Sequence, residues 1–140
     1  MRVVIDTNLW VSGLLWRGLP GRLLRLAQAG QIELCLTPAM LSELAEVLAY
    51  ERFQPRLAQL GLTPAELLTY ASSLVTLFED ADGMPIVQAD PDDDVFLHCA
   101  ERVGAACVVS GDHHLLSLKQ HAGIPILTVH DFLAREFPHA

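Results

Sequence analysis

Residues 90–116 read DPDDDVFLHCAERVGAACVVSGDHHLL and hold the pattern that decides the fold. Four aspartates precede an apolar run with helical spacing, and the strand-like run CVVSGD (107–112) follows. One or two acids at a helix start complement the helix dipole or cap the helix, but four exceed that need. The stretch therefore predicts a helix and a buried strand, with more negative charge than the helix itself requires.

The rest of the chain repeats this alternation of strand and helix. Short apolar runs predict strands at 2–6, 33–37, 107–112 and 124–129 and a further one at 74–78, and apolar residues three and four apart predict helices at 20–29, 38–49, 64–75 and 94–103. Thr37 before Pro38 predicts a helix start, and Thr63 with Glu66 matches a capping box. The alternation predicts an α/β fold: one domain (1–140), a three-layer α/β/α sandwich around a parallel sheet of four to five strands.

Composition limits the class of protein. The 140 residues are 51% hydrophobic and 19% charged, which suits a sheet buried on both faces. No run approaches the roughly 18 apolar residues of a membrane span, so we expect no membrane partner and a cytoplasmic location. The three cysteines form no CxxC pair and the six histidines lack zinc spacing, so we expect buried free thiols and no zinc site.

The net charge of −8 speaks against nucleic acid as a partner, but the charge is unevenly spread. Residues 1–60 hold six arginines against five acids, whereas residues 61–140 hold three basic residues against twelve acids. Three of the arginines lie close together early in the chain: Arg17, Arg22 and Arg25. They form either a solvated helix face or a set of contacts to RNA phosphates.

Four acids are predicted to lie at one edge of the sheet, because each follows a different strand or opens a helix there: Asp6, Glu43, Asp94 and Asp112. Ligands of open parallel sheets bind at this carboxyl edge. Converging carboxylates repel one another unless cations bind, and their oxygens suit Mg²⁺ or Mn²⁺, one or two ions. Such ions support phosphodiester hydrolysis without a protein nucleophile. The predicted supporting residues, which orient ligands or water, are Thr7, Asn8, Ser110 and Asp92.

Each of these residues also has a plainer interpretation. Asp6 and Asp112 can cap the helices that follow them, and Asp94 can cap the helix of the quoted stretch. Glu43 alone is an ordinary helix acid. The helix start can also shift by one or two residues, which leaves Asp92 or Asp93 as an alternative to Asp94.

The segments VVIDTNLWVSGLL, LSELAEVL, DPDDDVFLHCAERVGAACVVSGDHHLL and IPILTVHDFL together resemble the PIN-domain family, in particular the small bacterial VapC-like toxins of toxin–antitoxin systems. The resemblance covers nearly the whole chain. It implies an Mg²⁺- or Mn²⁺-dependent endoribonuclease whose acidic positions map onto Asp6, Glu43, Asp94 and Asp112. It also implies a homodimer and a cognate antitoxin protein as partner.

Three other interpretations match part of the sequence. An EF-hand loop from Asp90 needs glycine where Val95 stands. A phosphoaspartate phosphatase or receiver domain needs a late functional lysine, and the only lysine, Lys119, falls in a predicted helix. A catalytically silent PIN fold would bind RNA or protein, and an exposed apolar face around Trp10 and Trp16 would provide a surface for a protein partner.

Overall fold

The sheet forms the centre of the molecule. The computed structural model describes residues 1–79 and 94–138. The strands pair in the order β3-β2-β1-β4-β6-β5, and their bounds are β1 Arg2–Ile5, β2 Glu33–Leu36, β3 Val75–Leu77, β4 Cys107–Val109, β5 Gln120–His121 and β6 Ile124–Leu127. All pairs are parallel except β5 with β6, which is antiparallel. The predicted parallel sheet is confirmed with five parallel strands, and the short strand β5 is an addition to the prediction.

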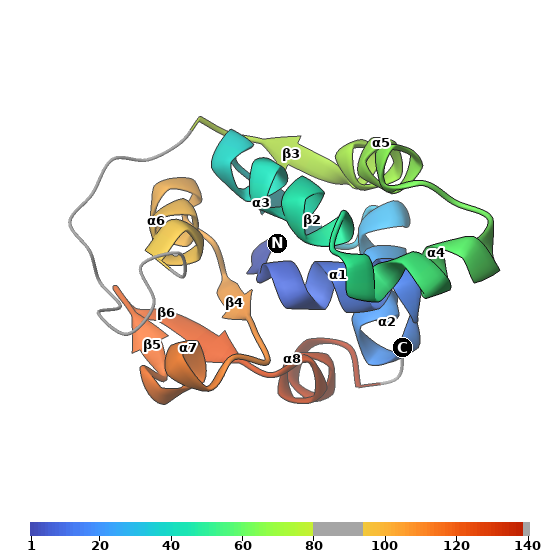
Figure 1. Cartoon of the computed structure of the whole chain (residues 1–140). Coiled ribbons are helices and arrows are strands. Elements are labelled where there is room, and N and C mark those ends of the chain that lie inside the picture. Colours follow the sequence, from blue (N-terminus) through green and yellow to red (C-terminus); the bar gives the residue numbers. More distant parts are fainter. Residues whose placement is uncertain (80–93, 139–140) are drawn as a thin grey trace.

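Helices enclose this sheet on both faces. Their bounds are α1 Thr7–Leu15, α2 Gly18–Gln28, α3 Pro38–Leu48, the 3₁₀ turn η1 Glu51–Phe53, α4 Gln54–Leu60, α5 Pro64–Leu74, α6 Asp94–Val103, α7 His113–Ser117 and α8 Val129–Glu136. Helix α6 packs across β1, β2 and β4, and α1 packs on α2 and α3. In Figure 1, α6 lies on one side of the sheet, and α1, α2 and α8 lie on the other. The chain thus forms the predicted α/β/α sandwich.

The central strands are buried because both faces of the sheet are covered. Val3, Val4 and Ile5 of β1 are at most 1% exposed, and the three residues of β4 are buried as well. Such strands appear in the sequence as continuous apolar runs without alternation. The cysteines at 35, 99 and 107 lie in this core as free thiols, as expected. Burial raises the pKa of Cys35 to about 11 and that of Cys107 to about 12.

Helix caps appear where the sequence predicts them. The Thr37 hydroxyl accepts the backbone N–H of Met40 at 3.3 Å, and Pro38 opens helix α3. The capping box of α5 is complete, because the Thr63 hydroxyl accepts the Glu66 N–H and the Glu66 carboxylate accepts the Thr63 N–H, each at 3.2 Å. These caps satisfy backbone donors that helix starts leave unpaired.

One sequence prediction about the second half is wrong. Lys119 does not lie in a helix, because α7 ends at Ser117 and Lys119 has a φ of 64° at the turn into β5. The turn is tight, because the Gln120 N–H donates to the Leu118 carbonyl at 2.7 Å. Four elements beyond the predicted helices also appear, namely α1, η1, α4 and α8. Among the described helices, none is long and apolar enough to cross a membrane.

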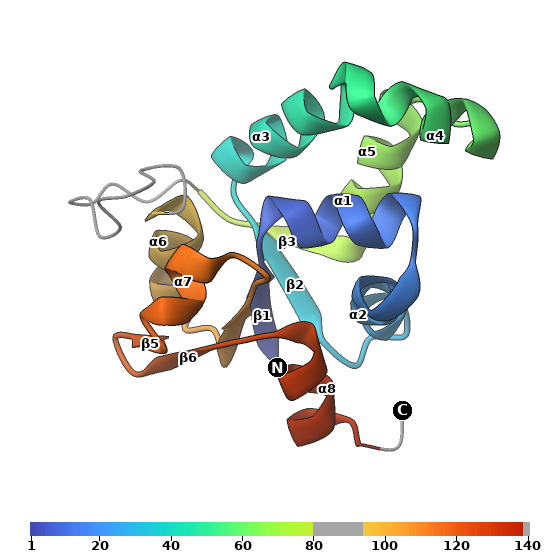
Figure 2. The same ribbon diagram turned by 60° about the horizontal axis from the view of Figure 1, so that its bottom comes forward.

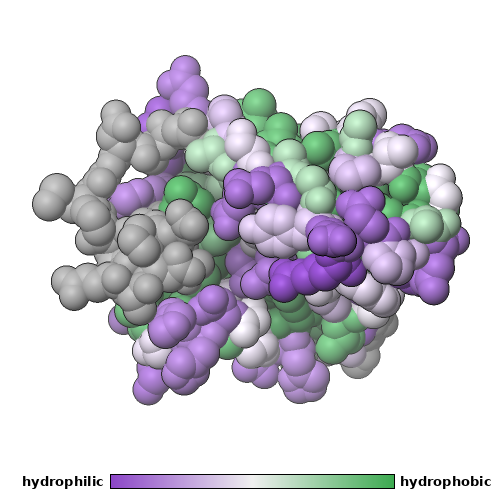
Figure 3. Space-filling view, in the orientation of Figure 1, coloured by the Kyte–Doolittle hydropathy of each residue, from purple (hydrophilic) through white to green (hydrophobic). Residues whose placement is uncertain are grey.

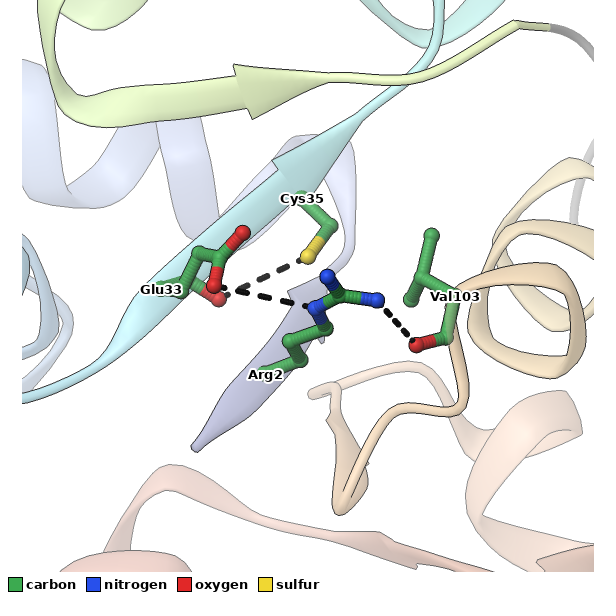
Figure 4. Close-up of polar contacts among 4 residues, drawn as sticks. All are labelled: Arg2, Glu33, Cys35 and Val103. Carbon is green, nitrogen blue, oxygen red and sulfur yellow. Dashed lines mark hydrogen bonds and ion pairs between the residues drawn. The ribbon is translucent and has the colours of Figure 1, made fainter.

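The amino edge of the sheet is held by an arginine. Arg2 donates from its guanidinium to the Val103 carbonyl at 2.8 Å, and its Nε lies 3.6 Å from the Glu33 carboxylate (Figure 4). The same guanidinium lies 5.2 Å from the centre of the Phe78 ring. These contacts join β1 to β2 and to the end of α6.

Candidate active site

The carboxyl ends of two neighbouring strands form the centre of the site. Strands β1 and β4 are in register, with Ile5 beside Val109, and the Asp6 N–H donates to the Val109 carbonyl at 3.2 Å. Asp6 and Ser110 are therefore the first residues past the paired strands. This is the sheet edge at which parallel α/β proteins bind ligands, and Figure 2 shows β1 and β2 side by side beneath α1 and α3.

Asp6 is buried, with only 3% of its surface exposed. It caps α1, because its Oδ1 accepts the Leu9 N–H at 2.8 Å. Its Oδ2 accepts the Ser110 hydroxyl at 2.5 Å and the Gly111 N–H at 3.3 Å. A carboxylate offers about four lone-pair positions, so these three donors leave roughly one for a further ligand.

Ser110 connects Asp6 to Asp112. The Ser110 hydroxyl donates to Asp6 and accepts the backbone N–H of Asp112 at 2.9 Å, and the side chain is completely buried. Asp112 is only partly buried and caps α7, because its Oδ1 accepts the N–H groups of His114 at 2.7 Å and Leu115 at 3.4 Å. Both aspartates thus have the capping role that the sequence left open, and Oδ2 of Asp112 accepts no hydrogen bond from the described residues.

The electrostatic environment of Asp6 is unfavourable for its negative charge. Burial raises the pKa of the Asp6 carboxyl, and the nearby negative charge of Asp112 raises it further, while the hydrogen bonds from Ser110, Leu9 and Gly111 lower it. Burial is the strongest of these causes. No arginine or lysine in the described part of the chain forms an ion pair with Asp6. The site therefore holds a buried carboxyl group that accepts hydrogen bonds but has no basic partner among the described residues.

The other two predicted acids lie on helices. Glu43 is half-buried in α3 and takes part in an interaction of its own. Asp94 is the first residue of α6. Because α6 leads directly into the parallel strand β4, its first residue lies at the carboxyl edge of the sheet, the edge of Asp6. Asp92 and the side chain of Asp94 lie outside the described part.

The donors present suit a hard divalent cation. The Asp6 and Asp112 carboxylates are oxygen ligands of the kind that Mg²⁺ and Mn²⁺ prefer, and they lie close enough for the charge of Asp112 to affect Asp6. Among the described residues, no three His, Cys, Asp or Glu side chains are grouped as a metal site. The chemistry of the pair fits a divalent ion, and any third carboxylate has to reach the same edge from α3 or α6.

The predicted supporting residues differ in their placement. Ser110 contacts Asp6 directly, as described above. Thr7 is buried at the start of α1, whereas the Asn8 side chain beside it is exposed. Sequence reasoning missed the Gly111 N–H, which donates to Asp6. A backbone donor leaves no signal in the sequence, and glycine itself is not required here, because a Cβ on Gly111 would meet no atom within 4 Å.

The three early arginines do not act as one group. Arg17 and Arg25 line a cavity of about 480 Å³ between α1, α2 and α5, together with Gln28, Glu66 and Tyr70. Arg22 lies at a smaller hollow between α2 and α8, beside His130. Arg17 and Arg25 therefore share a surface, and Arg22 faces another.

The family of the chain follows from comparison with known proteins. Residues 2–114 match the model of the PIN domain, and the chain belongs to this family, whose members are generally nucleases. A comparison with curated protein sequences finds no significant relative.

Solved structures share the fold. VapBC2 from Rickettsia felis, solved bound to a DNA fragment from their promoter, is similar with a TM-score of 0.61 at 13% identity, over 90% of this chain and 97% of that one. PAE2754 from Pyrobaculum aerophilum is similar with a TM-score of 0.57 at 16% identity, over 96% of this chain and 88% of that one. At these identities the likeness concerns the fold.

Proposed function

We propose that this PIN-domain protein is an endoribonuclease that hydrolyses RNA phosphodiester bonds with Mg²⁺ or Mn²⁺. The observation that carries the proposal is the buried Asp6 carboxylate, which lies at the ligand-binding edge of the sheet beside Asp112 and without a basic partner among the described residues. A buried charge without a partner costs stability, and proteins keep such groups mainly where they function. A divalent cation and a phosphate would complete the charge balance of this edge.

The residues of the chain divide into ligands and supports. Asp6, Glu43, Asp94 and Asp112 would hold one or two ions, with Asp6 as the central ligand. When bound, such ions activate water and stabilise the charge of the leaving oxygen. Ser110 keeps one Asp6 oxygen in place through its hydroxyl.

Three further residues are proposed as supports at the same edge. Buried Thr7 would orient the start of α1 next to Asp6, and exposed Asn8 would face water or substrate. Asp92, outside the described residues, would supply an additional acid. Such supports fix the geometry of the ligands and keep a carboxylate in the orientation that binds the ion.

A toxin–antitoxin role is the proposed biological setting. It is supported by the PIN-domain match and by the shared fold with VapBC2. We propose a cognate antitoxin protein as a partner, a homodimer as the assembly and the cytoplasm as the location. Co-purification of the chain with the product of a neighbouring reading frame, and loss of RNA cleavage in that complex, would support the pairing.

Arg17, Arg22 and Arg25 are proposed contacts to RNA phosphates. Arg17 and Arg25 form no ion pair with any carboxylate of the described residues, so their charge is available to an anion. Each lost phosphate contact lowers the salt dependence of single-strand binding by about 0.7 in log–log slope. Arg22→Gln tests the separate surface of Arg22. A lower salt slope would indicate a phosphate contact, and an unchanged slope would indicate a solvated helix face.

The test of the ribonuclease is cleavage of a mixed RNA pool with Mg²⁺ or Mn²⁺. We expect Asp6→Asn to reduce cleavage by more than about 100-fold, because loss of a direct ligand exceeds the typical effect of its supports. Asp131→Asn is the matched control, since Asp131 is an exposed aspartate in the first turn of α8. Cleavage that persists after chelation and in Asp6→Asn would refute the metal-dependent nuclease, and absence of cleavage with retained RNA binding would favour the silent binding module.

A further inference from the structure

Aromatic and arginine side chains gather at the end of α1 that is remote from Asp6. We define the aromatic–arginine cluster as Trp16, Tyr50, Arg52, Phe53 and Arg56, which come from the end of α1, the end of α3, the turn η1 and helix α4. Helix α1 lies between its caps, Asp6 and Trp16, and is about 14 Å long for its nine residues. The cluster and the acidic edge are thus the two ends of one helix.

The cluster is built by interleaved rings and guanidinium groups. The Trp16 and Phe53 rings meet edge to face at 5.9 Å between centroids. The Arg52 guanidinium lies over both Phe53, at 4.8 Å, and Tyr50, at 5.5 Å, and the Arg56 guanidinium lies 5.9 Å from the Trp16 ring. Arg56 is held in place because its Nε donates to the Leu15 carbonyl at 2.8 Å.

The rings are more exposed than a structural role requires. Trp16 is 52% exposed and Tyr50 is 41% exposed, whereas Trp10, six residues before Trp16 and within α1, is 1% exposed. Two large aromatic rings exposed within one cluster form a candidate interaction surface. Their flat faces can stack on a planar partner. Neither Arg52 nor Arg56 forms an ion pair with a carboxylate of the described residues. In Figure 3 a strongly hydrophilic area covers the junction of α3 and α4, where this cluster lies.

We propose that the aromatic–arginine cluster is a platform for single-stranded RNA, on which bases stack on Trp16 and Tyr50 while Arg52 binds a phosphate. Bases stack on exposed aromatic rings regardless of sequence, and free guanidinium groups neutralise the strand between them. A protein with a net charge of −8 needs such a local basic surface to hold RNA. The inference rests on the ribonuclease function proposed above and extends it, because it assigns the substrate a single-stranded segment that continues from the acidic edge along α1.

Binding to uncleaved RNA tests the platform separately from catalysis. The protein carries Asp6→Asn, and the probe is a fluorescein-labelled oligouridylate of about 12 nucleotides, within the usual size of single-strand sites. We expect Trp16→Ala to weaken binding about 10-fold, in the range known for loss of one stacked base. We expect Arg52→Gln to lower the log–log salt slope by about 0.7. A duplex of the same length should bind more weakly and respond to neither change.

Matched controls and a spectroscopic readout separate stacking from loss of fold. Leu77→Ala removes an exposed apolar side chain (55%) on β3, and Arg135→Gln removes an exposed arginine on α8; neither should change binding. Oligouridylate should quench tryptophan fluorescence, and Trp16→Phe should abolish the quenching while keeping most of the affinity, because buried Trp10 remains as an insensitive emitter.

The outcomes for catalysis and for the platform are distinct. In protein with an intact Asp6, Trp16→Ala and Arg52→Gln should raise the KM for single-stranded RNA about 10-fold and leave kcat unchanged. Normal binding by both variants, or equal binding of duplex and single strand, would overturn the platform even if Asp6-dependent cleavage is established. Loss of binding in both variants would support the platform even if the Asp6-dependent cleavage fails.

Discussion

The charged side chains at the two ends of strand β1 differ in whether the fold gives them an oppositely charged partner. At the amino end, the Arg2 guanidinium contacts the Glu33 carboxylate, the Val103 carbonyl and the Phe78 ring. At the carboxyl end, Asp6 is buried beside a second carboxylate and receives only neutral donors from the described residues. Only three residues, Val3, Val4 and Ile5, thus separate a charge that the fold neutralises from one that it does not. This is the difference that the proposed function predicts, with contacts that stabilise the fold at the first end and a cation site at the second.

Of the substitutions that test the difference between the two ends, Ser110→Ala is expected to have the largest effect. Ser110→Ala removes the hydroxyl that holds one Asp6 oxygen and accepts the Asp112 N–H. Loss of such a supporting contact typically costs 10- to 100-fold in activity, and we expect a loss of about 30-fold in RNA cleavage. Single-turnover cleavage measures it, with Ser72→Ala, an exposed serine of α5, as the control. Full activity in Ser110→Ala would show that the geometry of Asp6 does not depend on this contact.

An intermediate effect is expected at the opposite end of β1. Arg2→Ala removes a hydrogen bond, a cation–π contact and an exposed ion pair, and we expect a loss of about 1–2 kcal/mol in the free energy of unfolding. Chemical denaturation measures this loss. Because Arg2 lies at the amino edge, the kcat of RNA cleavage should stay unchanged in the folded variant. A fall in kcat with normal stability would mean that the two ends are coupled.

A smaller effect concerns pH. The pKa of Asp6 is raised in the folded protein, so the folded state retains a proton that the unfolded state has already released. The Asp6 contribution to the stability of the metal-free protein is therefore complete below the unfolded pKa near 4, and it is lost as pH rises through the folded pKa. Asp6→Asn should remove this pH dependence and raise the melting temperature at neutral pH.

Thermal melting of both proteins across pH, with chelator present, measures the difference. Addition of Mn²⁺ should restore stability to the wild type and leave Asp6→Asn unchanged, because a ligand stabilises only the form that binds it. A variant that melts below the wild type at every pH would show that the Asp6 charge is satisfied inside the fold.

The sequence predicts the strands better than the helices around them. The core strands are short continuous apolar runs, and their short length between helical patterns identifies them as buried strands. Helix α1 escaped the prediction because Thr7–Leu15 is apolar on nearly all sides, being packed between α2 and α3, so it shows no amphipathic period. Lys119 was placed in a helix because the apolar spacing of HHLLSLK continues to it, whereas the backbone turns there at a positive φ.

The acidic edge and the aromatic–arginine cluster also differ in how well the sequence predicts them. Asp6, Ser110 and Asp112 lie at the carboxyl ends of the predicted strands 2–6 and 107–112, so their meeting at one edge follows from the parallel sheet. The aromatic–arginine cluster joins Trp16 to residues 50–56 through contacts between the end of α1 and the η1–α4 segment. No local sequence pattern predicts these contacts. Residues one strand apart in a sheet are predictable, whereas residues joined by helix packing require the structure.

Direct titration of Mn²⁺ into the metal-free protein tests the central claim, that the Asp6 edge is built for a divalent cation. The wild type should bind Mn²⁺ saturably, with Mg²⁺ as competitor, and Asp6→Asn should lose that binding while Asp131→Asn keeps it. Equal Mn²⁺ affinity in the wild type and Asp6→Asn would contradict the account, because the buried carboxyl group at the end of β1 would then have no role in holding the ion.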